Sequence, residues 1–307
     1  MGSAAVVLEG VTKRYGGFMA VDDLSFQAAA GRILGFLGPN GAGKTSSIRM
    51  MLGLIAPTSG RISVLGEPDA SRVRARIGFL PEERGLYRRM TPVAAIAFLA
   101  SLKGVPPAEA KRRARALLEE QGLGAAMDRQ VRSLSKGMAQ KVQLLSALAH
   151  EPDLVILDEP FSGLDPVNQQ SLEAIIRKLA DRGATVIFST HVMQHAERLC
   201  DHVVLLAGGR KVFDGSVAQA RSAAPRTLVL EGPFDPAAVA DLPGLEGLAS
   251  EAGEGGGVRV TAALRTGAPA QDVLKAAFAK GLDIQRFELK EPHLHDAFIV
   301  LTQGGPA

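Results

Sequence analysis

The sequence predicts an α/β protein with a doubly wound core, followed by a smaller α+β segment. Up to about residue 222, short apolar runs alternate with stretches of helical spacing, the pattern of a parallel sheet covered by helices. Two runs, 33–37 (ILGFL) and 154–157 (LVIL), are apolar throughout, as expected for strands buried on both faces. From residue 223 to 307 the pattern changes, and we expect a separate accessory domain there.

The predicted core, residues 1–222, contains runs with the periodicity of strands and runs with the periodicity of helices. We expect strands at 6–11, 25–28, 33–37, 61–65, 77–80, 154–157 and 185–189, and helices at 46–54, 92–123, 140–149 and 167–180. The stretch 196–206 (AERLCDHVVLL) is also expected to be helical, with the Cys200 thiol buried as a small hydrophobic group.

The accessory segment, residues 223–307, alternates strands and helices on a shorter scale. We expect strands at 227–231, 257–262 and 284–289, helices at 236–242, 269–280 and 294–301, and a glycine-rich loop at 251–257. The order is roughly βαββαβ, which suggests a small ferredoxin-like fold.

Composition excludes several classes of protein. Apolar residues make up 46% of the 307, which is ample for a core, and the single cysteine cannot form an internal disulfide, as is typical of a reducing compartment. The net charge of +3 leaves basic and acidic residues nearly balanced and favours no polyanionic partner. The longest apolar run, 93–102, is about half the roughly 20 residues needed to span a bilayer, so we expect a membrane role to need a partner chain.

A phosphate-binding loop follows the strand at 33–37. The sequence GPNGAGKT fits the pattern G-x-x-x-x-G-K-[ST] at every fixed position, between a buried strand and a helix. Backbone N–H groups and the positive end of the helix would hold phosphates, Lys44 would pair with their oxygens, and the Thr45 hydroxyl would bind Mg²⁺. We therefore expect Mg-ATP to be bound by Gly38, Pro39, Asn40, Gly41, Ala42, Gly43, Lys44, Thr45 and Ser46.

A pair of carboxylates ends the strand at 154–157. Ionised groups at the end of a buried strand are costly unless a cation pairs with them, and Mg²⁺ would be that cation. We expect Asp158 to hold the metal and Glu159 to act as general base on the attacking water. Without the phosphate loop, two solvated acids capping a strand would be the better interpretation.

Further motifs resemble those of ABC transporter ATP-binding subunits, over about residues 5–220. The segment 134–138 (LSKGM) is similar to the LSGGQ signature, 162–165 (SGLD) to the D-loop, and His191 stands where that family has its switch histidine. Tyr15, in RYGG, resembles the aromatic residue that stacks on adenine, with plain packing as the alternative. The resemblance implies a P-loop NTPase core with a mixed sheet, flanking helices and a helical subdomain at about 88–150.

The resemblance also implies a mechanism. Two copies would close head to tail, with ATP held by the phosphate loop of one copy and the signature of the other. His191 would contact the γ-phosphate, although a lone histidine at a strand end is more often structural. The residues implied on the signature and D-loop side are Ser135, Lys136, Gly137, Met138 and Asp165.

Two positions depart from the family pattern. Glu82 occupies the place of the usual glutamine, which implies a metal-binding and catalytic role with an added negative charge near the γ-phosphate. Met138 replaces the usual glutamine of the signature. The segments 81–87 (PEERGLY) and 291–298 (EPHLHDAF) nonetheless resemble a subgroup of sodium-extrusion and multidrug exporter ATPases that carry a small C-terminal domain of unknown function.

The resemblance implies an exporter ATPase at the cytoplasmic face of the membrane, working with a permease on a separate chain. Arg84, Arg88 and Arg89 form a basic cluster that is either a docking surface for that partner or a solvated face. The alternative function is a soluble ABC-type ATPase acting on ribosomes or nucleic acid. One ATPase half without a heptad run favours the transporter, and we expect no nucleic-acid partner.

Overall fold

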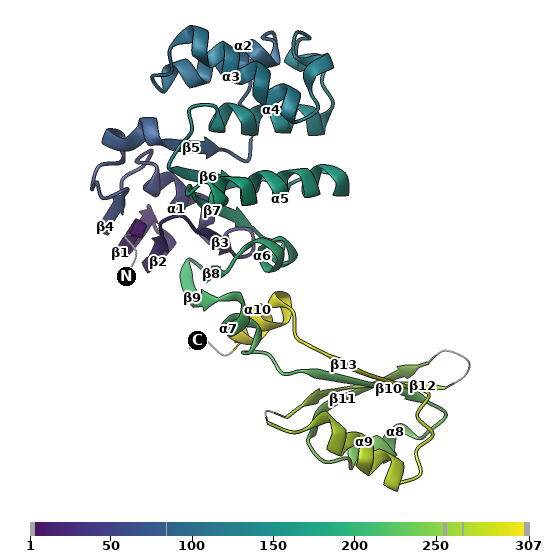
Figure 1. Cartoon of the computed structure of the whole chain (residues 1–307). Helices are drawn as coiled ribbons and strands as arrows, with labels where there is room; N and C mark the ends of the chain where they lie inside the picture. The colour runs from purple at the N-terminus through teal and green to yellow at the C-terminus, as the bar shows by residue number, and fades with distance from the viewer. Residues whose placement is uncertain (1–3, 84, 254–256, 266, 304–307) are drawn as a thin grey trace. The chain divides into compact units, whose positions relative to one another are not determined.

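The computed structural model describes residues 4–83, 85–253, 257–265 and 267–303 (Figure 1). The chain divides into two compact units, the first ending at Val217 and the second beginning at Ala218. Arg84, part of the basic cluster considered above, lies outside the described residues; Arg88 and Arg89 are exposed.

A six-stranded sheet forms the centre of the first unit, in the order β5-β6-β7-β3-β8-β9. Strands β5 to β8 in that order are parallel, and β9 is antiparallel to β8, so the sheet is mixed and the predicted α/β class is confirmed. The strands are β3 (Ile33–Leu37), β5 (Ile77–Leu80), β6 (Leu154–Asp158), β7 (Thr185–Thr190), β8 (His202–Ala207) and β9 (Arg210–Ser216).

A second, antiparallel sheet belongs to the same unit, with β1 (Ala4–Tyr15) between β2 (Phe18–Ala29) and β4 (Ser59–Val64). Helix α1 (Lys44–Met51) shares one apolar core with both sheets. Phe26 of β2 and Phe36 of β3 meet there with their ring centroids 5.4 Å apart. This shared core packs beneath α1 and so supports the loop that precedes it.

Three helices form a group with its own apolar core: α2 (Pro92–Leu102), α3 (Pro107–Glu120) and α4 (Lys136–Leu148). Figure 1 shows α2 and α3 on the far side of α4 from the central sheet. The sequence predicts one helical stretch at 92–123, but Pro106 and Pro107 start a new helix because proline fits a first turn and not a helix interior. Short 3₁₀ helices lie at Ala70–Arg76, Gly124–Ala126 and Val131–Ser133.

The two remaining helices of this unit are α5 (Pro166–Asp181) and α6 (Met193–Leu199). The prediction of one helix through 196–206 is wrong, because α6 ends at Leu199 and β8 begins at His202. The continuous run of valine and leucine after His202 favours a buried strand. Cys200 lies between them with extended backbone, and burial raises the pKa of its thiol.

The second unit begins within α7 (Val217–Arg221) and then has the βαββαβ order that the sequence predicts, with a closing helix. Its sheet is antiparallel in the order β11-β12-β10-β13. One strand, β11 (Leu245–Ala252), was not predicted, since it is exposed along almost its whole length and has no apolar alternation. The other elements are β10 (Thr227–Gly232), α8 (Pro236–Ala240), β12 (Val258–Leu264), α9 (Ala270–Ala279), β13 (Arg286–Lys290) and α10 (Leu294–Gln303).

The helices of both units are short compared with a lipid bilayer. Among the described residues, none is long and apolar enough to cross a membrane. The most apolar, α2, has 11 residues.

Candidate nucleotide-binding and hydrolysis site

The phosphate loop joins β3 to α1 and is shaped by its glycines. Gly43 caps α1 with φ of 96°, and a Cβ there would lie 2.5 Å from the carbonyl oxygen of Ala20. Gly41 also has positive φ, but a Cβ there would meet no atom within 4 Å. The outer side of Gly41 is therefore open to a bound group, while Gly43 packs the loop onto β2.

Lys44, the first residue of α1, is a buried cation with only 6% of its surface exposed. Its Nζ donates to the carbonyl oxygens of Gly38, at 2.7 Å, and Pro39, at 3.2 Å. The same Nζ lies 3.4 Å from Oε1 of Glu159. The structure thus brings the lysine of the phosphate loop and the predicted general base into direct contact.

Glu159 follows the last residue of β6 and is held in a strained conformation, with φ of +46°. Its Oε2 lies 3.0 Å from Nδ1 of His191, so Lys44 and His191 both contact this carboxylate. Oε1 is buried and has no hydrogen-bond donor among the described residues, in spite of the nearby Lys44 charge. A buried carboxylate oxygen in that state is suited to accept a hydrogen bond from water or another polar group.

Ser189, on β7, connects the two acids and was not predicted as a site residue. Its Oγ donates to Oδ1 of Asp158 and accepts from the N–H of Glu159, at 3.1 Å. The signal in the sequence is a hydroxyl in an otherwise apolar strand, which is costly to bury unless it is hydrogen-bonded. Ser189 therefore fixes the Asp158 carboxylate and the backbone of Glu159.

The groups expected to hold Mg²⁺ are all oxygen donors, which fits that cation. Asp158 is buried at the end of β6, and Thr45 is half-buried in the first turn of α1. No cluster of three His, Cys, Asp or Glu residues suited to a metal ion occurs in the described parts of the chain. A magnesium ion held by Thr45 and Asp158 would also take ligands from phosphate oxygens and water.

Glu82 lies apart from this contact group. It is exposed after the end of β5 and makes no hydrogen bond or ion pair with another described residue. Tyr15 is at the end of β1, with 46% of its surface exposed and the Lys13 Nζ 5.1 Å from its ring centroid. An exposed ring of this kind is available to a flat ligand.

The signature and D-loop segments pack against each other at the starts of α4 and α5. Helix α4 begins at Lys136 and not at 140, because the Ser135 hydroxyl accepts from the Met138 N–H at 3.3 Å. Asp165 caps α5 in the same way, accepting from the Asn168 backbone N–H at 3.0 Å, and these hydrogen bonds lower its pKa.

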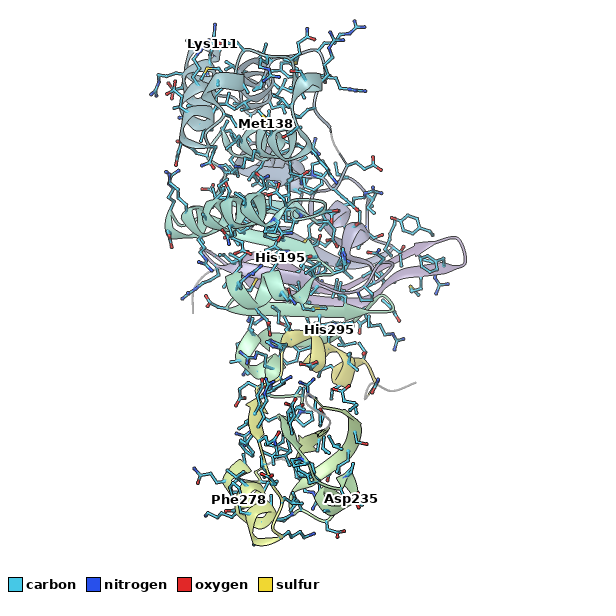
Figure 2. The ribbon with its side chains drawn as sticks, turned by 90° about the vertical axis from the view of Figure 1, so that its right-hand side faces the viewer. Lys111, Met138, His195, Asp235, Phe278 and His295 are labelled. Carbon is cyan, nitrogen blue, oxygen red and sulfur yellow. The ribbon has the colours of Figure 1, made fainter. Side chains whose placement is uncertain are left out.

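Two side-chain ends lie close to the glycines of these segments. A Cβ at Gly137 would lie 2.6 Å from Nδ2 of Asn168, and the Lys136 ammonium covers Gly163. Met138 is half-buried on α4, where Figure 2 labels it. No hydrogen bond or ion pair between described residues joins the signature segment to Lys44 or Glu159, so the predicted site falls into two groups within one chain.

Comparison with known proteins gives a consistent result. Residues 21–162 match the model of a family described as "ABC transporter". A Bacillus subtilis protein described as "Uncharacterized ABC transporter ATP-binding protein YhaQ" is 38% identical over 96% of this chain and 97% of its own length. The "Nod factor export ATP-binding protein I" of Cupriavidus metallidurans is 37% identical over 69% of this chain and 71% of its own.

Solved structures show the same likeness. One titled "Structure of ATP binding subunit of ABC transporter" has a TM-score of 0.66 and 32% identity, covering 71% of this chain and 92% of that one. The cbiO1 protein of Clostridium perfringens, described as part of the ABC transporter complex cbiONQ, has a TM-score of 0.63 and 26% identity, with coverage of 69% and 88%.

Proposed function

This chain belongs to the family of ABC transporter ATP-binding proteins, and we propose that it hydrolyses ATP to drive a membrane exporter. One observation carries the proposal: Lys44, Glu159 and His191 come from the ends of three neighbouring strands and meet at the Glu159 carboxylate. A buried cation, a carboxylate with one oxygen that accepts no hydrogen bond from described residues, and an imidazole are groups suited to phosphoryl transfer to water.

The chain's own residues then have defined tasks. The phosphates of ATP lie against the backbone N–H groups of the loop 38–43 and the start of α1. Lys44 exchanges its carbonyl partners, Gly38 and Pro39, for phosphate oxygens. Glu159 accepts a proton from the attacking water, and His191 donates a hydrogen bond toward the γ-phosphate.

Mg²⁺ in this site neutralises charge on the phosphates. Thr45, Asp158 and Glu82 are the residues that would hold it, and Ser189 fixes the direction of the Asp158 carboxylate. Tyr15 stacks on the adenine ring in the same proposal.

A second copy of the chain completes the site. Ser135, Lys136, Gly137, Met138 and Asp165 are proposed to contact the ATP held by the partner's phosphate loop. Each chain carries one phosphate loop and one signature, so a two-fold dimer makes two equivalent sites. Within one chain, no hydrogen bond or ion pair between described residues joins the signature segment 134–138 to Lys44 or Glu159, which supports this arrangement.

The transporter assignment extends to a partner in the membrane. We propose a permease on a separate chain, with this chain at the cytoplasmic face, and export as the direction of transport. Support comes from the relative named for Nod factor export and from the neighbour described as part of a transporter complex. The sodium-extrusion subgroup and its C-terminal domain are proposed from segments 81–87 and 291–298.

Hydrolysis by the purified protein tests the proposal. We expect Mg-dependent release of phosphate from ATP, loss of binding and hydrolysis in Lys44→Ala, and at least about 10²-fold slower hydrolysis in Glu159→Gln with ATP binding kept. Glu246→Gln, which removes an exposed carboxylate from the second unit, is the matched control and should hydrolyse at the wild-type rate. Equal rates in Glu159→Gln and wild type would contradict the assignment of the base.

A further inference from the structure

His195, on α6, is a buried histidine that the mechanism above does not use. Only 4% of its surface is exposed, and Figure 2 labels it in the first unit. Its ring stacks on that of Phe161, with the centroids 3.9 Å apart and the planes at 12°. Such close parallel contact fixes both rings relative to each other.

Phe161 belongs to the segment 159–165, which begins with Glu159 and ends with Asp165. Short turns tie this segment together: the Ser162 N–H donates to the Glu159 carbonyl at 3.1 Å, and the Leu164 N–H to the Phe161 carbonyl at 3.2 Å. The Phe161 ring also contacts that of Phe188, on β7, edge-on, with the ring centroids 5.8 Å apart. A shift of the Phe161 ring therefore moves the backbone that carries Glu159.

Polar neighbours hold His195 in place. Its Nδ1 lies 3.3 Å from Oε1 of Glu173, on α5, and 3.1 Å from Nη2 of Arg198. When Nδ1 carries the proton it donates to Glu173, and when it does not it accepts from Arg198. Arg198 and Glu173 also pair directly, at 2.8 Å, so the ring orientation is set by two charged groups that support each other.

We propose that His195 is a positioning residue for ATP hydrolysis, holding segment 159–165 against the segment that follows His191 through its stack on Phe161. The inference rests on the proposed function. Two contacts join these segments, His191 Nδ1 to Glu159 Oε2 and the His195–Phe161 stack, and both histidines lie between β7 and the end of α6. The His195–Phe161 stack therefore sets the distance between His191 Nδ1 and Glu159 Oε2.

Steady-state kinetics of three substitutions at this position test the role of the stack. We expect His195→Ala to lower kcat about tenfold or more while KM for ATP changes less than about threefold, because the phosphate loop is untouched. His195→Phe keeps a ring on Phe161 and should retain kcat within about threefold. His195→Gln keeps a polar group near Glu173 but loses the stack, so it should resemble His195→Ala.

A double-mutant cycle identifies the contact responsible. Phe161→Leu alone should lower kcat as His195→Ala does, and the double variant should be no slower than the slower single variant, since both remove one interaction. The matched control is His150→Gln, at a half-buried histidine whose Nε2 donates to the Ile77 carbonyl. That variant should hydrolyse ATP at the wild-type rate.

The outcomes separate this inference from the proposed function. Absence of hydrolysis by the wild type would overturn the proposed function itself. With an active wild type, an unchanged kcat in His195→Ala, or additive losses in the double variant, would overturn the positioning role alone. If His195→Ala does not fold, the comparison of His195→Phe with His195→Gln decides the same question.

Discussion

Among single side chains, His150 has an environment that favours its neutral form. The ring is half-buried after α4, its Nε2 donates to the Ile77 carbonyl, and its Nδ1 is buried without a partner among the described residues. Burial first, and the positive charge of Lys103 second, lower the pKa of His150 from 6.5 to about 4. The folded protein therefore keeps this imidazole neutral where the unfolded chain is already protonated.

We expect the free energy of unfolding to fall as the pH drops from 7 to 4. The unfolded chain binds a proton near pH 6.5 and the folded one only near 4, so the contribution is fully present at pH 7 and lost through that window. Allowing for solvent around a partly exposed ring, the loss from His150 is about 1–2 kcal/mol. Urea unfolding at pH 7, 5.5 and 4.5 should show a shallower pH dependence in His150→Gln; equal slopes would refute the assignment.

Glu82 is one of the two positions at which the sequence departs from the pattern of the family it resembles. In the proposed site, a carboxylate there would add a negative charge near the γ-phosphate, which an amide would not. We expect Glu82→Gln to raise the maximal rate of ATP hydrolysis about two- to tenfold, and to raise the Mg²⁺ concentration needed for half-maximal rate, because an amide is the weaker ligand. A titration of hydrolysis against Mg²⁺ measures both. Glu83→Gln, next to it and also exposed, is the control and should change neither.

At the level of strands and helices, the close approach of β5 to α4 depends on Gly78. A Cβ there would lie 2.4 Å from the carbonyl oxygen of Ala147 and 3.0 Å from Cγ of Pro152. Because backbone cannot move aside as a side chain does, this glycine sets the spacing between the sheet and the helix group. The loop after β5 that carries Glu82 starts from this contact, and Gln143 of α4 donates to the Glu83 carbonyl at 3.1 Å.

Gly78→Ala should lower the free energy of unfolding of the first unit by about 1–3 kcal/mol, as overpacking does elsewhere. The matched control is Gly17→Ala, where a Cβ meets no atom within 4 Å and the φ is not positive. Both tyrosines of the chain, Tyr15 and Tyr87, belong to the first unit, so tyrosine fluorescence during urea unfolding follows that unit alone. Equal stability of the two variants would contradict the packing described for β5.

Elements that are apolar on every side were predictable from the sequence. The strands β3, β6 and β7 are fully buried and lie where the continuous apolar runs predict them. Elements with weaker patterns were not: β11 is exposed, β9 is an antiparallel edge strand, and β8 follows a helix so closely that its valines read as part of it. Contacts over long distances, such as Ser189 with Asp158 and His195 with Phe161, have no local signature.

The predicted catalytic residues are divided unequally between the two units. The second unit has its own apolar core, formed by residues such as Leu228, Val260 and Val273, and carries none of the predicted catalytic residues. The first unit carries all of them. In the proposed function, ATP hydrolysis therefore depends on the first unit, together with a second copy of the chain and a permease.

We expect the Glu159→Gln variant, added to native membranes with Mg-ATP, to recover a polytopic membrane protein. The variant should hold ATP without hydrolysing it and so keep the complex closed. Lys44→Ala, which should not bind ATP, is the control and should recover much less of the same protein. Recovery of ribosomes or nucleic acid in its place would favour the alternative function while leaving the ATPase assignment intact.

Head-to-tail closure of two copies is central to the proposed function, because no hydrogen bond or ion pair between described residues joins the signature segment 134–138 to Lys44 or Glu159. Light scattering of Glu159→Gln with and without Mg-ATP tests it most directly. We expect the mass of one chain, 32.2 kDa, without nucleotide and twice that mass with saturating Mg-ATP. The larger mass should be lost in Glu159→Gln combined with Ser135→Arg. A mass of 32.2 kDa at saturating Mg-ATP would contradict it.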